Sequence, residues 1–180
     1  MTSRRWPART ALALVAVAAA CGGGAAPAGE PAELAGITAA HNTVRAGVGV
    51  GPLKWSPALA ATAAAWAARC VDDESPFGII DHNPDRRTGH PYYVGENIYA
   101  STGSASPTVA VSKWAAEAAH YDYATNTCAA GQVCGHYTQV VWAGTREVGC
   151  ARHDCPGLAY PSAIVCDYGP GGNVAGSKPY

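Results

Sequence analysis

Residues 134–155 read "CGHYTQVVWAGTREVGCARHDC" and set His136 and Gln139 directly before the apolar "VVW". Further along, "EVGCAR" (147–152) and "AIVCDY" (163–168) alternate in the manner of two β-strands, joined by the turn-rich "HDCPGLAYPS". Helical patterns come earlier in the chain and these strands come late. We therefore expect an α+β fold, with a mainly antiparallel sheet and helices on its faces.

Three helices are expected upstream. The first begins near Glu33 and ends at the glycines of "GVGVG". The other two begin at Ser56-Pro57 and Ser106-Pro107, because serine is a favoured N-cap and proline fits the first turn. The apolar faces of these two helices are expected to be Leu59, Ala63, Trp66 and Cys70, and Val111, Trp114, Ala118 and Tyr121.

The N-terminus is typical of an export signal. Arg4, Arg5 and Arg9 precede "ALALVAVAAA", an apolar stretch too short to span a bilayer as a helix. "AAAC" followed by "GGG" resembles a bacterial lipobox with a lipidated Cys21; the alternative is ordinary cleavage near Ala20 and free secretion. We expect an export signal over 1–21, a flexible tether over 22–32 and one domain over 33–180, at the cell surface or outside the cell.

The cysteine count supports export. Without Cys21, six of the seven cysteines remain, an even set that suits a disulfide framework in an oxidising compartment. The net charge of −1 falls to about −4 without the three N-terminal arginines, since 9 basic residues then face 13 acidic ones. This balance offers no basic surface for nucleic acid, and membrane contact is expected only through a lipid anchor.

The long segment "VDDESPFGIIDHNPDRRTGHPYYV" (71–94) has little periodicity and is expected to be a loop that is functional or tied down by other parts of the chain. Glu117 is unusual because it lies three residues after Trp114 and four before Tyr121, on an apolar helix face. A carboxylate in that position needs a partner. The sequence contains no H-E-x-x-H zinc motif and no G-x-S-x-G nucleophile motif.

Five segments occur in a fixed order along the chain: "GENIY" (95–99), "WAAEAAHY" (114–121), "CGHYTQVVW" (134–142), "VGCA" (148–151) and "CDYGPGGN" (166–173). Together they resemble the CAP superfamily of cysteine-rich secretory, antigen 5 and pathogenesis-related proteins, whose module is also called the SCP domain. The resemblance is strongest to the plant pathogenesis-related type. It implies a three-layer α-β-α sandwich with the disulfides Cys70–Cys155, Cys128–Cys134 and Cys150–Cys166.

The resemblance also implies a cleft with two histidines and two glutamates. The matching motifs supply Glu96, Glu117 and His136, and His82 of "DHNP" is the expected fourth member, with His90 as its rival. Three interpretations stay open. His82 and His136 bind Zn²⁺ with Glu96, Glu117 or water completing the site; the four residues act as general acid and base; or they form a polar network that holds the loops.

The function implied by the resemblance is binding rather than catalysis. The expected ligand is a sterol-like or fatty-acid-like lipid, with Tyr121 and Tyr123 beside it, or another surface protein. The alternatives are a secreted metal-dependent hydrolase of the protease type and a structural envelope protein.

Overall fold

The structure is a computed structural model that describes residues 29–180. The expected export signal, the lipobox Cys21 and residues 22–28 of the expected tether lie outside the described residues. No helix within the described range is long and apolar enough to cross a membrane. The elements in chain order are η1 (Ala32–Leu34), α1 (Ile37–Gly47), β1 (Lys54–Trp55), α2 (Pro57–Ala67), β2 (Gly95–Ser101), α3 (Pro107–Ala116), η2 (Glu117–His120), β3 (Tyr121–Asp122), β4 (Thr127–Cys128), α4 (Gly135–Val140), β5 (Glu147–Asp154) and β6 (Ser162–Gly169).

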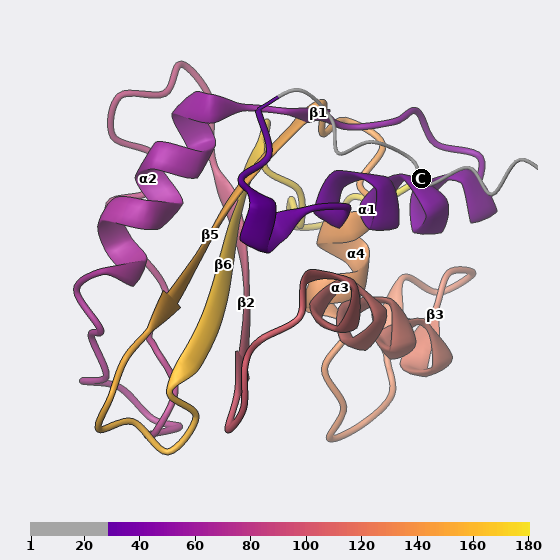
Figure 1. The fold of residues 1–180 in the computed structure, drawn as a ribbon. Coiled ribbons are helices and arrows are strands. Elements are labelled where there is room, and N and C mark those ends of the chain that lie inside the picture. The colour runs from indigo at the N-terminus through magenta and orange to yellow at the C-terminus, as the bar shows by residue number, and fades with distance from the viewer. Residues whose placement is uncertain (1–28) are drawn as a thin grey trace, which may run out of the picture.

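The main sheet has four strands in the order β1-β5-β6-β2. β5, β6 and β2 pair antiparallel, and only the two-residue β1 runs parallel to its neighbour β5. Figure 1 shows α2 on one face of this sheet and α1, α3 and α4 on the other. This arrangement confirms the expected three-layer, mainly antiparallel α-β-α sandwich.

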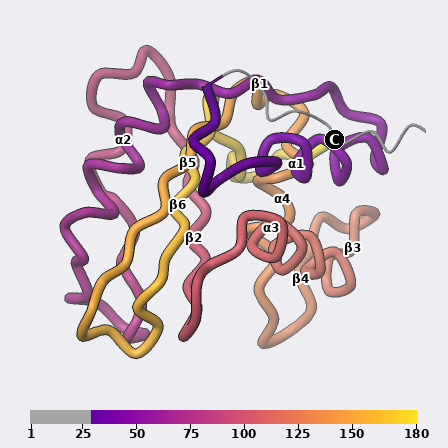
Figure 2. The backbone as a smooth tube through the Cα atoms, in the orientation of Figure 1, coloured from indigo at the N-terminus to yellow at the C-terminus, as the bar shows by residue number. Residues whose placement is uncertain are grey.

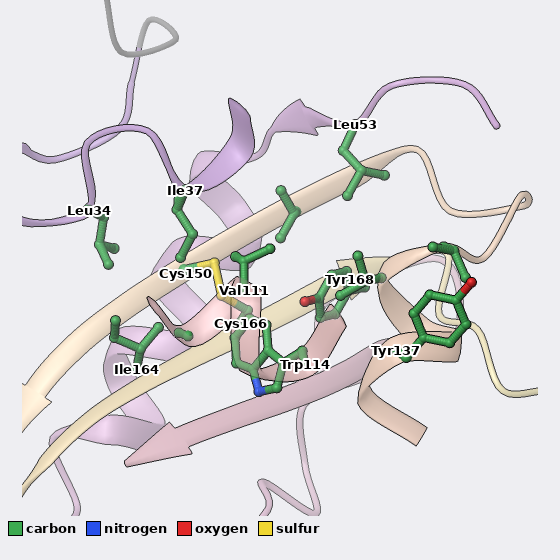
Figure 3. Close-up of a cluster of buried hydrophobic side chains, with 14 of the residues drawn as sticks. Leu34, Ile37, Leu53, Val111, Trp114, Tyr137, Cys150, Ile164, Cys166 and Tyr168 are labelled. Carbon is green, nitrogen blue, oxygen red and sulfur yellow. A yellow bond between two sulfur atoms is a disulfide. The ribbon is translucent and has the colours of Figure 1, made fainter. Parts of the chain in front are cut away.

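Each face of the sheet carries its own hydrophobic core. Ile164, Cys166 and Tyr168 of β6 point toward α1 and α3, where Trp114 is 2% exposed (Figure 3). The alternate residues Ala163 and Val165 point toward α2 and pack with its buried side chains. Gly149 of β5 is required where α2 crosses the strand, because a Cβ there would collide with backbone atoms of α2.

Three disulfides brace the layers. Cys150–Cys166 joins β5 to β6 inside the larger core (Figure 3), Cys128–Cys134 closes the loop before α4, and Cys70–Cys155 spans 85 residues. These are the three pairs that the resemblance implies. Each is expected to contribute roughly 2–4 kcal/mol of stability.

The loop over 71–94 is tied down by contacts with other parts of the chain. Cys70 fixes its start to the connection between β5 and β6, beside which it runs in Figure 2. The amide of Tyr160 donates to the carbonyl of Gly78 (2.9 Å), and the Trp66 indole donates to the carbonyl of Asp81 (2.7 Å). The loop therefore has a fixed position when it reaches His82.

The structure differs from three local expectations only in detail. The first helix begins at Ile37, after a separate 3-10 turn, and Glu30 accepts hydrogen bonds from the amides of Gly36 and Thr38 (both 2.8 Å). The ordered domain therefore starts before residue 33, inside the expected tether. Ala118 is exposed because α3 changes to a 3-10 turn after Ala116. Ser56 and Ser106 occupy the N-cap positions, but neither side chain makes a capping hydrogen bond.

Candidate functional site

His82 and Glu96 form one of two His–Glu pairs. Nδ1 of His82 lies 2.6 Å from Oε1 of Glu96; the histidine side chain is 57% exposed and the glutamate side chain 1%. The same Oε1 accepts a hydrogen bond from the amide of Asn83 (3.0 Å). Glu96 thus holds both the ring and the backbone of the loop, and it does so from inside the protein.

His90, the rival candidate, is held elsewhere. Its Nε2 lies 2.9 Å from the hydroxyl of Thr62 on α2, and its ring stacks on Tyr92. The structure therefore brings His82, rather than His90, to the glutamate of the "GEN" motif. The choice depends on how the loop folds back over α2.

His136 and Glu117 form the second pair. Nδ1 of His136 lies 2.5 Å from Oε1 of Glu117, and the side chains are 30% and 17% exposed. Oε2 of Glu117 accepts the amides of His136 (3.0 Å) and Tyr137 (3.1 Å), the first turn of α4. Glu117 therefore supplies the N-terminal cap that α4 lacks within its own sequence. This is the partner that the sequence pattern required for a carboxylate on an apolar helix face.

Strand β2 links the two pairs. Glu96 points to the α2 side of the sheet, where it lies opposite Asp167 in the strand register. Its neighbour Asn97 points to the other side and donates from Nδ2 to the backbone carbonyl of His136 (3.1 Å). Successive residues of one strand thus position the two histidines from opposite faces of the sheet.

The imidazoles are arranged as metal-binding histidines commonly are. A carboxylate on Nδ1 fixes the tautomer with hydrogen on Nδ1 and leaves Nε2 as the lone-pair donor. No hydrogen bond from the described residues reaches Nε2 of His82 or His136. Each imidazole can therefore offer its Nε2 lone pair to a metal ion such as Zn²⁺. Within residues 29–180 the only group of three close ligand atoms is that of Cys70, His153 and Cys155, and its two cysteines form a disulfide.

A cavity of about 290 Å³ adjoins the second pair. Its walls include His136 and Glu117 on one side and Ile79 and Tyr160 on the other. His82 and Glu96 do not line it. The histidine with free Nε2 at this cavity is therefore His136.

Comparison with known proteins identifies the family. The model of the CAP family, described as the cysteine-rich secretory protein family, matches residues 38–168. The chain belongs to the CAP family. The pathogenesis-related protein PRMS of Zea mays is 46% identical over 142 residues, 78% of each chain. Pathogenesis-related protein 1A of Nicotiana tabacum is 43% identical over 142 residues, 78% of this chain and 77% of the relative.

A solved structure supports the same conclusion. The venom allergen-like protein 4 of Schistosoma mansoni superimposes with a TM-score of 0.66 at 27% identity, over 84% of this chain and 95% of that one. These matches confirm the CAP resemblance and its likeness to the plant pathogenesis-related proteins. The expected bacterial lipobox falls on residues that the structure does not describe.

Asp167 of this CAP domain is a buried residue that sequence reasoning missed. It is fully buried, and burial, followed by the nearby Glu96, raises its pKa to about 9. Neither of its carboxyl oxygens, nor Oε2 of Glu96, has a hydrogen-bond partner among the described residues. A neutral Asp167 resolves this, because its O–H supplies a donor where both carboxylates would otherwise only accept. The signal in the sequence was an acidic residue inside the otherwise apolar "AIVCDY".

A second buried network reaches the CAP cleft from α1. Asn97 donates to the hydroxyl of Tyr168 (3.2 Å), which lies 2.7 Å from Nε2 of His41, whose Nδ1 lies 2.8 Å from the carbonyl of Ile37. The carbonyl requires hydrogen on Nδ1, so Nε2 accepts from Tyr168. His41 is therefore a core residue with two specific partners, Ile37 and Tyr168.

His41 makes the stability of the domain sensitive to acid. Burial, the largest cause, lowers its pKa from 6.5 to about 4. The unfolded chain therefore binds a proton that the folded chain does not, and stability falls as the pH drops from about 6.5 to 4. The expected slope is about 1.4 kcal/mol per pH unit at most. Urea unfolding at pH 7, 6 and 5 measures it, and His41→Gln should lose this slope. Equal slopes in the two proteins would contradict the assignment.

The tyrosines expected at a lipid site are engaged by other groups. The hydroxyl of Tyr121 donates to Asn126 (2.6 Å). The ring of Tyr123 stacks on Tyr180 at 4.6 Å and lies under the ammonium group of Lys178. Tyr121, but not Tyr123, borders a cavity of about 290 Å³ whose other walls combine polar and apolar residues. The polar ones are Asn126, Gln132, Thr138, Asn173 and Ser177, and the apolar ones include Trp142, Val174 and Pro179.

Proposed function

We propose that this CAP domain is an extracellular binding protein whose His/Glu cleft takes a divalent transition-metal ion such as Zn²⁺. The ligand at the cavity would be Nε2 of His136. Nε2 of His82 is the second ligand that the resemblance implies, with water or a bound molecule at the remaining positions. The observation that carries the proposal is that both histidines have Nδ1 on a carboxylate and Nε2 free of partners. A bound zinc ion would supply a Lewis acid for a carbonyl or anionic group.

Binding is favoured over hydrolysis by what Glu117 already does. Its two oxygens accept three hydrogen bonds, from Nδ1 of His136 and from the amides of His136 and Tyr137. Glu96 is likewise committed to His82 and Asn83 and is only 1% exposed. A general base must reach the proton that it removes, and both carboxylates are occupied in holding the protein together.

The extracellular location is supported by the disulfides, which persist in oxidising compartments. We further propose that a lipid on Cys21 anchors the protein to the membrane surface; the alternative is free secretion. Lipid binding at Tyr121 and Tyr123 stays a prediction from the resemblance, and the mixed polar and apolar walls beside Tyr121 give it no specific support.

Glu117→Gln should switch off the metal site at His136 while keeping the fold. Glutamine retains an oxygen for the two amides of α4, but its NH₂ group then faces Nδ1 of His136. Nδ1 must become an acceptor, and hydrogen moves to Nε2, the proposed zinc ligand. We expect zinc affinity, measured by calorimetry, to fall about 10- to 100-fold. ¹⁵N spectra of the imidazole should show the change of tautomer directly.

His120→Gln is the matched control, because His120 is exposed and lies one turn further along η2. Its zinc affinity should equal that of the unmodified protein. Failure of the unmodified protein to bind zinc, or equal affinity in Glu117→Gln, would refute the proposed site. Turnover of a protein substrate that disappears in Glu117→Gln would favour the hydrolase alternative instead.

A further inference from the structure

Among the described residues, no strand pairs with the outer edge of β2. β2 is last in the sheet order and bonds only to β6, and Figure 1 shows it on the side of the sheet toward α3. Its sequence "GENIYAS" contains no proline, lysine or arginine, the residues that commonly protect an edge strand from pairing. Within residues 29–180, no other strand occupies this edge, although the Trp114 indole donates to its Ile98 carbonyl.

The direction of the backbone groups follows from one side-chain contact. The indole of Trp114 donates to the carbonyl of Ile98 (3.2 Å), and Figure 3 shows the indole nitrogen of Trp114 toward β2. That carbonyl therefore points away from β6. In an antiparallel strand both backbone groups of a residue point to the same side, and the sides alternate along the strand. Glu96, Ile98 and Ala100 thus present their amides and carbonyls outward. Apart from the Ile98 carbonyl, these groups make no hydrogen bond to loops, helices or side chains within residues 29–180.

A groove runs along this edge. The cavity of about 290 Å³ beside His136 contacts three consecutive strand residues, Ile98, Tyr99 and Ala100. Consecutive residues point to opposite faces of a sheet, so a cavity that touches all three must follow the edge itself. Ile79 and Tyr160 form one wall from the α2 side, and Trp114, Lys113 and Glu117 form the other.

We propose that this groove binds an extended peptide that adds to β2 as a further antiparallel or parallel strand. The outward amide and carbonyl of Ala100 and the amide of Ile98 would bond to the peptide backbone. Ile79, Ile98 and Tyr160 would receive an apolar side chain of the peptide. Lys113 makes no ion pair among the described residues, so an acidic side chain next to the apolar one completes the fit.

The size and shape of the groove favour a single peptide over other occupants. Its volume of about 290 Å³ lies just below the roughly 300–1,000 Å³ of ligand pockets, and its lining combines mainly apolar side chains with the edge of β2. A single added strand would lie about 4.8 Å from β2. A second copy of the domain would also have to fit the helices or loops that flank its strand between Tyr160 and Trp114. Peptide binding at β2 needs no metal at His136, so it is measured with any metal removed.

The probe is the peptide acetyl-TVTLEV-amide carrying a fluorophore, titrated with the domain in the presence of EDTA and followed by fluorescence anisotropy. We expect saturable binding. Two control peptides carry N-methyl groups on the odd-numbered or on the even-numbered backbone amides. The one whose methylated amides face β2 should bind at least tenfold more weakly, and the other should bind like the parent peptide. Ala100→Pro removes an outward N–H without breaking the pairing to β6 and should weaken binding about fivefold.

Two further variants keep the test decisive. Ala100→Val retains the amide and should bind as the unmodified domain does. Lys113→Glu, at an exposed position, should weaken binding of this peptide but not of its Glu-to-Lys version. Equal binding of both N-methylated peptides, or no binding of the parent peptide, would overturn the proposal. A concentration-dependent dimer that Ala100→Pro abolishes, without peptide binding, would also overturn it and assign the edge to a second copy.

Discussion

Replacing Arg45 with methionine is expected to destabilise the domain by about 4 kcal/mol or more, the largest loss among the changes considered. The Arg45 side chain is buried in the larger core, with the residue 1% exposed, and its guanidinium donates to four backbone carbonyls. Methionine fills a similar volume but leaves these acceptors without donors. Each unsatisfied buried acceptor costs about 1–3 kcal/mol. The four carbonyls are those of Gly51, Val140, Trp142 and Thr145.

The four carbonyls explain why one side chain has so large an effect. Val140 and Trp142 lie at the C-terminal end of α4, where helical carbonyls have no partner within the helix. Arg45 therefore closes α4 at one end, as Glu117 does at the other. Burial lowers the pKa of Arg45 to about 10, which still leaves it charged at neutral pH.

Urea unfolding at pH 7 measures this loss. Arg45→Lys is the informative comparison, because an ammonium group keeps the charge but has three donors on one nitrogen and cannot serve four separated carbonyls. We expect the free energy of unfolding of Arg45→Lys to lie between those of the unmodified protein and Arg45→Met. A loss below 1 kcal/mol in Arg45→Met would mean that the carbonyls find water or other donors.

Asp167→Asn is expected to stabilise the domain at neutral pH, on the order of 2–4 kcal/mol. The folded protein holds Asp167 as a neutral acid because burial and the neighbouring Glu96 raise its pKa to about 9. The unfolded chain, with an ordinary pKa near 3.9, releases that proton. Folding at pH 7 therefore includes the uptake of a proton by Asp167, which costs free energy because the carboxylate is ionised in the unfolded chain at this pH. Asparagine is neutral in both states, so it removes this cost, and its amide can still donate to Glu96.

The sign of the pH dependence provides the check. Between about pH 4 and 9 the folded state binds more protons than the unfolded state at this site, so the contribution of Asp167 to stability decreases as the pH rises. The gain from Asp167→Asn should accordingly grow from pH 5 to pH 8 in urea unfolding. Asp73→Asn, which makes the same charge change at an exposed position, should show no such trend. A gain that is flat with pH would contradict a neutral Asp167.

Local patterns in the sequence predicted what depends on local structure. The Ser-Pro pairs marked where α2 and α3 begin, and alternation marked β5 and β6. β2 was recognised only as a motif, because its first residues Gly, Glu and Asn are poor strand formers. The strand forms because it pairs with β6, about 70 residues away.

The site required the same distant information. Glu96, Glu117 and His136 came from motif resemblance, whereas spacing alone did not separate His82 from His90. That choice is made by the loop, which the Cys70–Cys155 disulfide and the Trp66 indole hold in place. Asp167 faces Glu96 only because of the register between β2 and β6, which no property of either segment alone specifies.

The double role of Glu117 has a consequence for how the site opens. Because this carboxylate holds both the first amides of α4 and the ring of His136, fraying of the helix and release of the imidazole are the same molecular event. The affinity of any ligand for His136 is therefore coupled to the local unfolding equilibrium of a six-residue helix. The measured binding free energy includes the free energy of forming that helix. In this domain, recognition and the folding of α4 form a single thermodynamic cycle.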